Sequence, residues 1–155
     1  MRNASVNCPF CGVLNRVDLE QLLRGPKCGG CGRPLHLDRP QAISGDSLDR
    51  VLGETDVPVL LDCYAAWCAP CRIMAPLLDE VAHDRAGEIL VAKLDTDRDP
   101  GVAGRLGVRS IPTLIVFVRG QEIARQVGVV PRRTLDEMLT TASAACTSYS
   151  PGATT

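Results

Sequence analysis

The sequence predicts an α/β domain with a mixed sheet between helices, preceded by a small cysteine-rich unit. Two apolar runs, over residues 57–64 and 89–94, are typical of strands that are buried on both faces of a sheet. A segment with helical apolar spacing follows each run, and a hairpin and a last helix complete the order. The chain of 155 residues therefore has room for one compact domain of about 100 residues and a small appendage.

The first 34 residues contain two Cys-x-x-Cys pairs and many Gly and Pro residues, with little periodicity. This composition predicts metal-clamped turns instead of helices. Residues 35–42 include Asp38-Arg39-Pro40 and are interpreted as a linker into the larger domain. We place the small unit at residues 1–40, the larger domain at 41–146 and a disordered polar tail at 147–155.

The larger domain opens with a short helix. Ser44 and the Gly-Asp-Ser after it supply N-cap residues, and the helix passes through Leu48, Val51 and Leu52. After the first buried strand, apolar residues keep helical spacing to about residue 85. Pro76 lies inside this segment, and we expect it to kink the helix because it removes a backbone donor.

The second half of the larger domain is predicted to contain a short helix, a hairpin and a last helix. Residues 102–106 suit a short helix, and 113–118 and 122–127 flank Arg119-Gly-Gln121 in a predicted hairpin. Pro131 starts a last helix. That helix has an apolar face made of Leu135, Met138, Leu139 and Ala142.

Charge and hydropathy exclude several classes of protein. The formal net charge is -1, which gives no reason to expect nucleic acid or an anionic membrane as a partner. No apolar run resembles an export signal or a transmembrane helix. Six of the eight cysteines are grouped in Cys-x-x-Cys pairs, which favours metal ligands and catalytic thiols in a reducing cytoplasm over a disulfide framework.

One Cys-x-x-Cys pair lies where an apolar strand gives way to a helix, in Trp67-Cys68-Ala69-Pro70-Cys71. A Cys at a helix start is stabilised as a thiolate by the macrodipole and by free backbone N–H groups. We expect Cys68 to attack a substrate disulfide, and Cys71 to resolve the mixed disulfide. Trp67 beside the reactive thiol predicts a flat apolar surface for docking.

Asp62 lies inside the apolar strand, six residues before Cys68. A carboxylate there is expected to be desolvated, with a raised pKa, and to exchange a proton with Cys71. Ile111-Pro112 precedes a later strand, and the residues alone leave open whether this bond is cis or trans.

The other two pairs are separated by sixteen residues, the spacing of a zinc ribbon. Cys8, Cys11, Cys28 and Cys31 supply four thiolates, so Zn²⁺ is expected to be structural because no ligand position stays open. Disulfides or a second thiol relay are the alternatives. Six basic and three acidic residues in 1–40 leave +1 after a zinc tetrathiolate of -2, too little to hold phosphates.

The larger domain resembles the thioredoxin family over about residues 42–145. The match is carried, in order and spacing, by Asp62, Trp67-Cys-x-Pro-Cys71, Pro76, Lys93, Ile111-Pro112-Thr113 and Gly128. The resemblance implies a thioredoxin fold, a cis bond at Pro112 that faces the dithiol, and Lys93 near Asp62. It also implies that a flavoprotein thioredoxin reductase uses NADPH to recharge the dithiol. With the amino-terminal pairs included, the chain resembles the zinc-containing bacterial branch of the family.

Two residues depart from the family pattern. Ala69 stands where Gly is usual between the cysteines, which leaves the reduction potential open. Cys63 stands where Phe is usual, and we expect it to pack as a small buried hydrophobe. Cys146 is expected to extend the buried stripe of the last helix.

The sequence therefore predicts a monomeric protein-disulfide reductase with an amino-terminal zinc ribbon, acting on oxidised substrate proteins. Pro112 is expected to mark backbone groups that hydrogen-bond an extended substrate segment. One alternative keeps the fold but makes the protein a zinc-regulated redox sensor or holdase chaperone. A second is a zinc-ribbon binding module with a vestigial dithiol.

Overall fold

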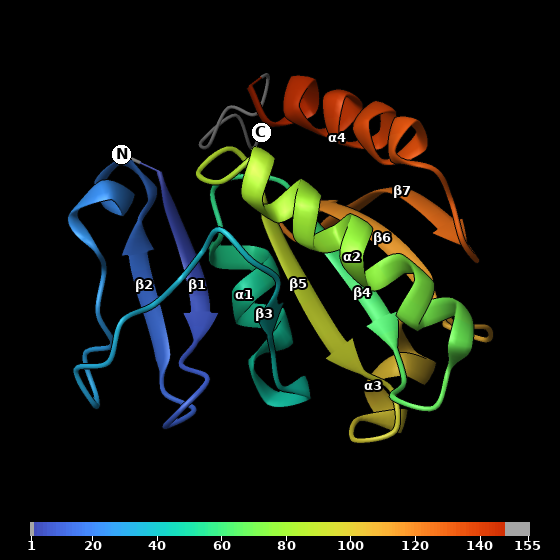
Figure 1. Cartoon of the computed structure of the whole chain (residues 1–155), viewed down its shortest axis with the longest axis horizontal. Helices are drawn as coiled ribbons and strands as arrows, with labels where there is room; N and C mark the ends of the chain where they lie inside the picture. The colour runs from blue at the N-terminus through green and yellow to red at the C-terminus, as the bar shows by residue number, and fades with distance from the viewer. Residues whose placement is uncertain (1, 148–155) are drawn as a thin grey trace, which may run out of the picture.

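The computed structural model describes residues 2–147, which form a small hairpin unit beside a five-stranded sheet with helices on both faces (Figure 1). The hairpin unit consists of β1 (Asn3–Asn7), β2 (Leu14–Asp18) and the 3-10 helix η1 (Leu19–Arg24). The larger unit consists of β3 (Gln41–Ala42), η2 (Gly45–Ser47), α1 (Leu48–Glu54), β4 (Val59–Tyr64), α2 (Ala69–Asp84), β5 (Leu90–Asp95), α3 (Pro100–Arg105), β6 (Thr113–Val118), β7 (Gln121–Val127) and α4 (Arg132–Thr147).

The central sheet has the strand order β3-β5-β4-β6-β7. Strands β3, β5 and β4 are parallel, whereas β6 and β7 run antiparallel to their neighbours. The β6–β7 hairpin turns through Arg119 and Gly120, which both have positive φ, as a tight connection requires. The mixed sheet confirms the predicted fold class.

Successive residues of β4 face opposite sides of the sheet, as strand geometry requires. Leu60 packs with the apolar faces of α2 and α4, whereas Leu61 and Cys63 pack with α1. Figure 1 shows the same two layers, with α2 and α4 on one face. Cys63 is fully buried in this packing, so the prediction of a small buried hydrophobe is confirmed.

The hairpin unit shares one apolar core with the larger unit. Ala4 and Val6 of β1 are fully buried in the cluster that contains Val51 of α1. The backbone N–H of Asp56 donates to the carbonyl of Asn3 (2.7 Å), and further bonds join β1 to the end of α1. This docking fixes the first cysteine turn relative to the sheet.

Helix α2 is the element that presents the dithiol. Cys68 is its N-cap, and the helix runs from Ala69 to Asp84 through Pro76. Pro70 occupies the first turn, where its missing N–H has no intrahelical partner to lose. Met74, Leu78 and Val81 anchor the helix on the sheet.

Three segments differ from the sequence-based expectation. Residues 2–34 contain two strands and a 3-10 helix as well as turns, and the segment interpreted as a linker ends in β3 on the edge of the sheet. The expected tail begins at Thr147, which is the last residue of α4, and residues 148–155 lie outside the described part of the chain. Within residues 2–147, every helix is too short or too polar to span a membrane.

Candidate functional site: a dithiol and a four-cysteine cluster

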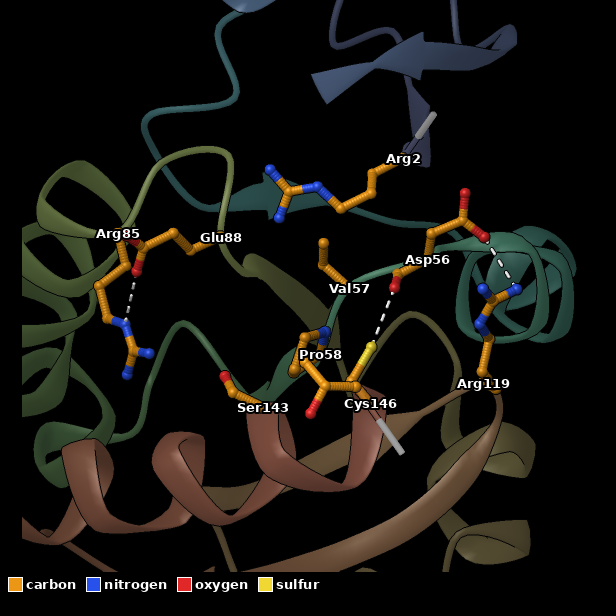
Figure 2. A pocket seen from close by; sticks show the side chains of 10 residues that line it. Arg2, Asp56, Val57, Pro58, Arg85, Glu88, Arg119, Ser143 and Cys146 are labelled. Carbon is orange, nitrogen blue, oxygen red and sulfur yellow. Dashed lines mark hydrogen bonds and ion pairs between the residues drawn. The ribbon is translucent and has the colours of Figure 1, made fainter. Parts of the chain in front are cut away.

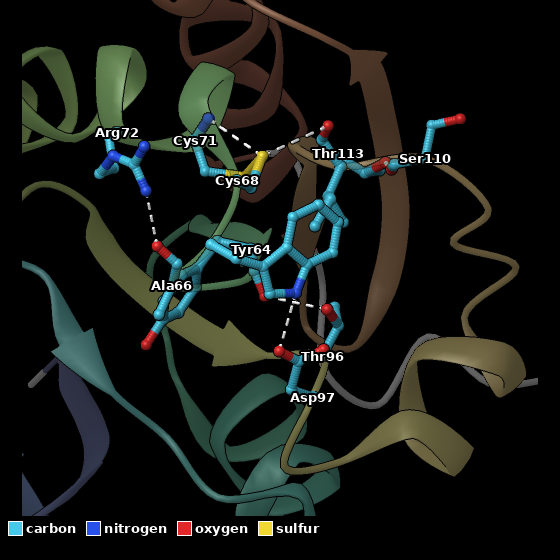
Figure 3. Close-up of a disulfide and its surroundings, with 11 residues drawn as sticks. Tyr64, Ala66, Cys68, Cys71, Arg72, Thr96, Asp97, Ser110 and Thr113 are labelled. Carbon is cyan, nitrogen blue, oxygen red and sulfur yellow. Dashed lines mark hydrogen bonds between the residues drawn. A yellow bond between two sulfur atoms is a disulfide. The ribbon is translucent and has the colours of Figure 1, made fainter.

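The dithiol lies where β4 ends and α2 begins, and Cys68 and Cys71 are joined by a disulfide (Figure 3). Their Cα atoms are 5.2 Å apart, which is the reach of one helical turn. Cys68 has an extended backbone, and its Sγ accepts a hydrogen bond from the N–H of Cys71 (3.2 Å). An N–H aimed at this sulfur stabilises negative charge on it when the disulfide is reduced.

The Ile111-Pro112 peptide bond is cis, as the resemblance implied. Sγ of Cys68 lies 3.7 Å from the carbonyl oxygen of Ile111, so this loop closes over the dithiol. The carbonyl of Pro112 accepts a hydrogen bond from the N–H of Gly128 (2.8 Å), which ties the loop to the end of β7. The loop thus lies against the dithiol, as expected.

Asp62 lies inside β4 and is 1% exposed. Among residues 2–147, no partner hydrogen-bonds to its Oδ1. Burial raises the pKa of this carboxyl to about 6, although the positive charge of Lys93 opposes the shift. Lys93 is the register partner of Asp62 on β5, and its Nζ lies 4.4 Å from the centroid of the Tyr64 ring.

Trp67 directly precedes Cys68 in the sequence and is 68% exposed. Its Nε1 donates a hydrogen bond to Oδ2 of Asp97 (2.9 Å). Arg72, in the first turn of α2, donates from Nη1 to the carbonyl of Ala66 (2.9 Å). These two bonds tether Ala66 and Trp67 just before the helix and leave the indole exposed.

The amino-terminal cysteines form one compact cluster, with all four sulfurs within 4.8 Å of one another. Sγ of Cys8 lies 3.7 Å from that of Cys31, and Sγ of Cys11 lies 3.6 Å from that of Cys28. A tetrahedron with zinc about 2.3 Å from each sulfur places its corners about 3.8 Å apart. The four side chains therefore fit a tetrahedral zinc site.

The two cysteine turns, which we call knuckles, have the same backbone pattern. The N–H of Cys8 donates to Val13 and that of Cys28 donates to Arg33, both at 2.8 Å. The left-handed Gly12 and Gly32 close the two turns. The first cysteine of each knuckle is buried and the second is exposed.

Polar contacts favour the thiolate at the first cysteine of each knuckle. Sγ of Cys28 accepts hydrogen bonds from Nδ2 of Asn15 (3.5 Å) and from the N–H of Gly30 (3.3 Å). Hydrogen bonds from Asn15, first, and then from the backbone of Cys31 and of Gly30 lower the pKa of Cys28 to about 6. A backbone hydrogen bond from Cys11 lowers the pKa of Cys8 in the same way. At Cys11, a backbone hydrogen bond from Val13 lowers the pKa, but the neighbouring sulfurs, led by that of Cys28, raise it to about 11. Deprotonated sulfur is the form that binds zinc.

Asn15 and Asp97 were missed by the sequence-based analysis. Asn15 follows the second cysteine of the first knuckle by four positions, and Asp97 lies in a run of alternating aspartates. A polar residue next to a metal motif was a usable signal for Asn15. The contact of Asp97 with Trp67 spans 30 positions, and local pattern does not reveal it.

Two of the cavities outside the dithiol contain residues named in the sequence analysis. One of about 440 Å³ separates the first knuckle from Tyr64 and Lys93. The other, of about 500 Å³, contains Cys146, whose Sγ donates to the carbonyl of Asp56 (3.1 Å) (Figure 2). Cys146 is half-buried against the core under α4, in line with the predicted stripe.

Comparison with known proteins matches both units. The thioredoxin family model matches residues 40–141, and the model described as "Thioredoxin 2, N-terminal", a zinc ribbon, matches residues 7–33. "Thioredoxin C-3" of Corynebacterium nephridii is 37% identical over 129 residues, which are 83% of this chain and 87% of that protein. "Thioredoxin 1" of Nostoc sp. is 50% identical over 86 residues, covering 56% of this chain and 80% of that protein.

A solved structure agrees with these matches. A mutant thioredoxin from Halobacterium salinarum NRC-1 is 32% identical, with a TM-score of 0.64, and the match covers 70% of this chain and 95% of that chain. Thioredoxins are protein-disulfide oxidoreductases, and the Cys68–Cys71 disulfide supplies the corresponding group here. The chain belongs to the thioredoxin family and carries in addition the zinc-ribbon region of the thioredoxin 2 branch.

Proposed function

We propose that this protein is a disulfide reductase that cycles Cys68 and Cys71 between dithiol and disulfide. The thiolate of Cys68 attacks one sulfur of a substrate disulfide, which forms a mixed disulfide and releases the other substrate sulfur as a thiolate. The thiolate of Cys71 then attacks Sγ of Cys68, which forms the Cys68–Cys71 disulfide and releases the second substrate thiolate. The substrate gains two electrons, and an NADPH-dependent thioredoxin reductase returns two electrons to the dithiol.

The position of Cys68 at the N-cap of α2 is the observation that carries this proposal. The N–H of Cys71 points at Sγ of Cys68, which supports Cys68 as the nucleophile. Cys71 lies one turn further into the helix and is in bonding contact with Cys68, which suits a resolving thiol.

Asp62 is the proposed proton partner of Cys71. A thiol must lose its proton before it attacks, and a buried carboxyl with a pKa of about 6 accepts a proton near neutral pH. Lys93, on the neighbouring strand, is proposed to favour the carboxylate form. Its place over Tyr64 keeps the positive charge close to the site.

The proposed docking surface consists of Trp67 and the Ile111-Pro112 loop. The exposed indole offers a flat apolar contact, and the backbone beside Pro112 offers hydrogen bonds to an extended substrate segment. Recognition by these groups depends little on side-chain identity, so oxidised proteins of many sequences are the proposed substrates.

We propose a structural zinc ion bound by Cys8, Cys11, Cys28 and Cys31. Bound zinc would join the two knuckles and leave no ligand position for a substrate. The buried core that β1 shares with α1 gives the ribbon a role in stabilising the fold. Four thiolate ligands suit a reducing compartment, so we propose a cytoplasmic location. The formal net charge of -1 gives no reason to expect nucleic acid or a membrane as a partner, and we propose that the protein is a monomer.

The test is NADPH oxidation in the presence of thioredoxin reductase and a protein disulfide substrate, with wild type compared to Cys68→Ser. Turnover by wild type that is lost in the variant supports the reductase. Cys146→Ser is the matched control, because it removes a thiol outside the dithiol, and its turnover is expected to equal that of wild type. Absence of turnover in metal-loaded wild type would overturn the assignment.

A redox sensor or holdase is the second candidate, favoured by the exposure of Cys11 and Cys31. Exposed thiolates are the ones an oxidant reaches first. Zinc that stays bound when peroxide has fully oxidised Cys68 and Cys71 would count against the sensor. Stoichiometric suppression of aggregation without turnover would favour the holdase.

A further inference from the structure

We propose that Asn15 is a positioning residue for the zinc centre, because its amide holds the second knuckle on the hairpin and donates to the sulfur of Cys28. This inference rests on the proposed binding of zinc by the four cysteines. It concerns a residue outside the Cys-x-x-Cys motifs, and it explains how two separate turns are brought to one ion.

The side chain of Asn15 forms three hydrogen bonds. Its Oδ1 accepts from the backbone N–H of Gly29 (2.9 Å). Its Nδ2 donates to the carbonyl of Val13 (3.1 Å) and to Sγ of Cys28 (3.5 Å). One amide therefore joins β2, the exit of the first knuckle, the backbone of the second knuckle and one ligand sulfur.

The two knuckles are held in different ways. Asn7 ties the first knuckle to the larger unit, because its Nδ2 donates to the carbonyl of Gly12 (3.1 Å) and to Oγ of Ser47 (3.0 Å). The second knuckle closes mainly on itself, through bonds such as that from the N–H of Leu35 to the carbonyl of Pro26 (2.8 Å).

The second knuckle meets the first through the sulfur contacts of the cluster. Apart from the cysteines, Asn15 is the side chain in the described part of the chain that hydrogen-bonds the second knuckle to the hairpin. The guanidinium of Arg33 also lies 4.4 Å from the centroid of the Phe10 ring. That contact is exposed and lies at the tips of the two turns, whereas Asn15 acts at a ligand sulfur.

The amide donor of Asn15 matters because the zinc site would carry a negative charge. Four thiolates around Zn²⁺ carry a net charge of -2, and hydrogen bonds to the sulfurs offset it. Loss of such an outer contact typically weakens metal binding by about 10- to 100-fold. We expect Asn15→Ala to fall in this range, because the substitution removes both the donor and the bond to Gly29.

Asn15→Asp separates the two roles. The carboxylate keeps an acceptor for the N–H of Gly29 but places a negative oxygen where Nδ2 meets Cys28. Like charge at this distance disfavours the thiolate. We therefore expect Asn15→Asp to bind zinc more weakly than Asn15→Ala. Arg16→Ala is the matched control, because Arg16 is the adjacent exposed residue of β2.

The experiment measures the zinc affinity of the full reduced chain by competition with a chromophoric chelator. Co²⁺ loading adds a second readout, because the sulfur-to-cobalt charge-transfer band reports on the electron density of the ligand sulfurs. We expect a 10- to 100-fold loss for Asn15→Ala, a larger loss and a shifted band for Asn15→Asp, and a change below about twofold for Arg16→Ala.

Wild-type affinity in either Asn15 variant would overturn the inference, and equal losses in the Arg16 control would overturn it too. Failure of wild type to bind zinc would overturn the proposed metal site itself, which keeps the two failures distinguishable. Should Asn15→Ala fail to fold, Asn15→Asp keeps the bond to Gly29 and still decides the question. Near-ultraviolet circular dichroism of each variant establishes that the sheet and its helices are intact.

Discussion

The dithiol at the start of α2 and the cluster of the amino-terminal knuckles use the same Cys-x-x-Cys spacing in two different backbones. At the helix, Cys68 and Cys71 meet each other one turn apart. In the knuckles, each cysteine approaches a cysteine of the other pair, as Cys8 approaches Cys31 at 3.7 Å. The first geometry closes a disulfide within a pair, whereas the second builds a four-sulfur cage between pairs.

Backbone N–H groups do not separate these outcomes. The N–H of Cys71 reaches the sulfur of Cys68, and in the knuckles one N–H likewise reaches the first cysteine of each pair, as at Cys8 and Cys28. The difference is the place of the second sulfur, which lies one helical turn away in the dithiol and in the opposite knuckle in the cluster. Spacing alone therefore does not assign chemistry to a Cys-x-x-Cys pair, and the element that carries it does.

A pair of serine substitutions gives the largest contrast between the two regions. Cys68→Ser is expected to lower turnover with thioredoxin reductase by at least about 1,000-fold, because it removes the nucleophile. Cys28→Ser is expected to leave turnover within about threefold of wild type, because the two sites act separately. Zinc content of both proteins completes the test. Loss of turnover in Cys28→Ser, in a chain that remains folded, would show that the two regions act together.

Removal of the metal is expected to have the next largest effect, and this effect concerns only the knuckles. Free zinc at a thousandfold above its dissociation constant stabilises a folded chain by about 4 kcal/mol. Chelation is expected to remove this amount from the free energy of unfolding, measured with urea under reducing conditions. Cys8→Ser should be insensitive to added zinc in the same assay. A zinc-independent midpoint in wild type would contradict a structural role.

The sequence predicts the dithiol well because its determinants are local. The apolar run of β4 ends where α2 begins. The Cys-x-x-Cys spacing and the strand before it lie within about a dozen residues. One short segment of the sequence therefore reveals both the reactive thiols and their position in the fold.

The hairpin unit was harder to predict because its secondary structure depends on contacts with residues that are distant in the sequence. β1 has only Ala4 and Val6 as apolar residues, and these form a strand because they are buried against α1. Residues 41 and 42 form β3 by pairing with β5, about fifty positions later. Asn15 acts through bonds to the second knuckle, which no periodicity encodes.

The contribution of Asp62 to the stability of the fold depends on pH, which gives a test that concerns the dithiol region and not the knuckles. Its pKa is raised from about 4 to about 6 by burial, so the native state holds this proton more tightly than the unfolded state. Between pH 4 and 6 the native state binds more protons, and its stability falls as pH rises through that range. Above pH 6 the buried carboxylate costs up to about 3 kcal/mol.

Asp62→Asn should therefore be more stable than wild type at pH 8 by up to about 3 kcal/mol, with the gain lost as pH falls from 6 to 4. Urea unfolding of both proteins at each pH measures the difference in their free energies of unfolding. Both proteins have the same cysteine cluster, so its titration cancels in this difference. Turnover of the variant should fall despite its greater stability, since the proton partner is gone. An equal difference in stability at pH 4 and pH 8 would show that Asp62 does not titrate in this range.

The smallest effect concerns the proposed docking surface, which would belong to the dithiol and not to the proposed zinc site. Asp97→Ala removes the acceptor of the Trp67 indole, an exposed hydrogen bond worth about 1 kcal/mol. We expect the KM for a protein disulfide to rise about fivefold with kcat unchanged, because the indole loses orientation but the sulfurs do not move. Trp67 is the one tryptophan of the chain, so its fluorescence reports the change directly, whereas zinc affinity should stay constant. Asp79→Ala, at an exposed position on α2, is the control. An unchanged KM together with shifted fluorescence would remove Trp67 from the docking surface and leave the Ile111-Pro112 loop as the contact that distinguishes the dithiol from the zinc cluster.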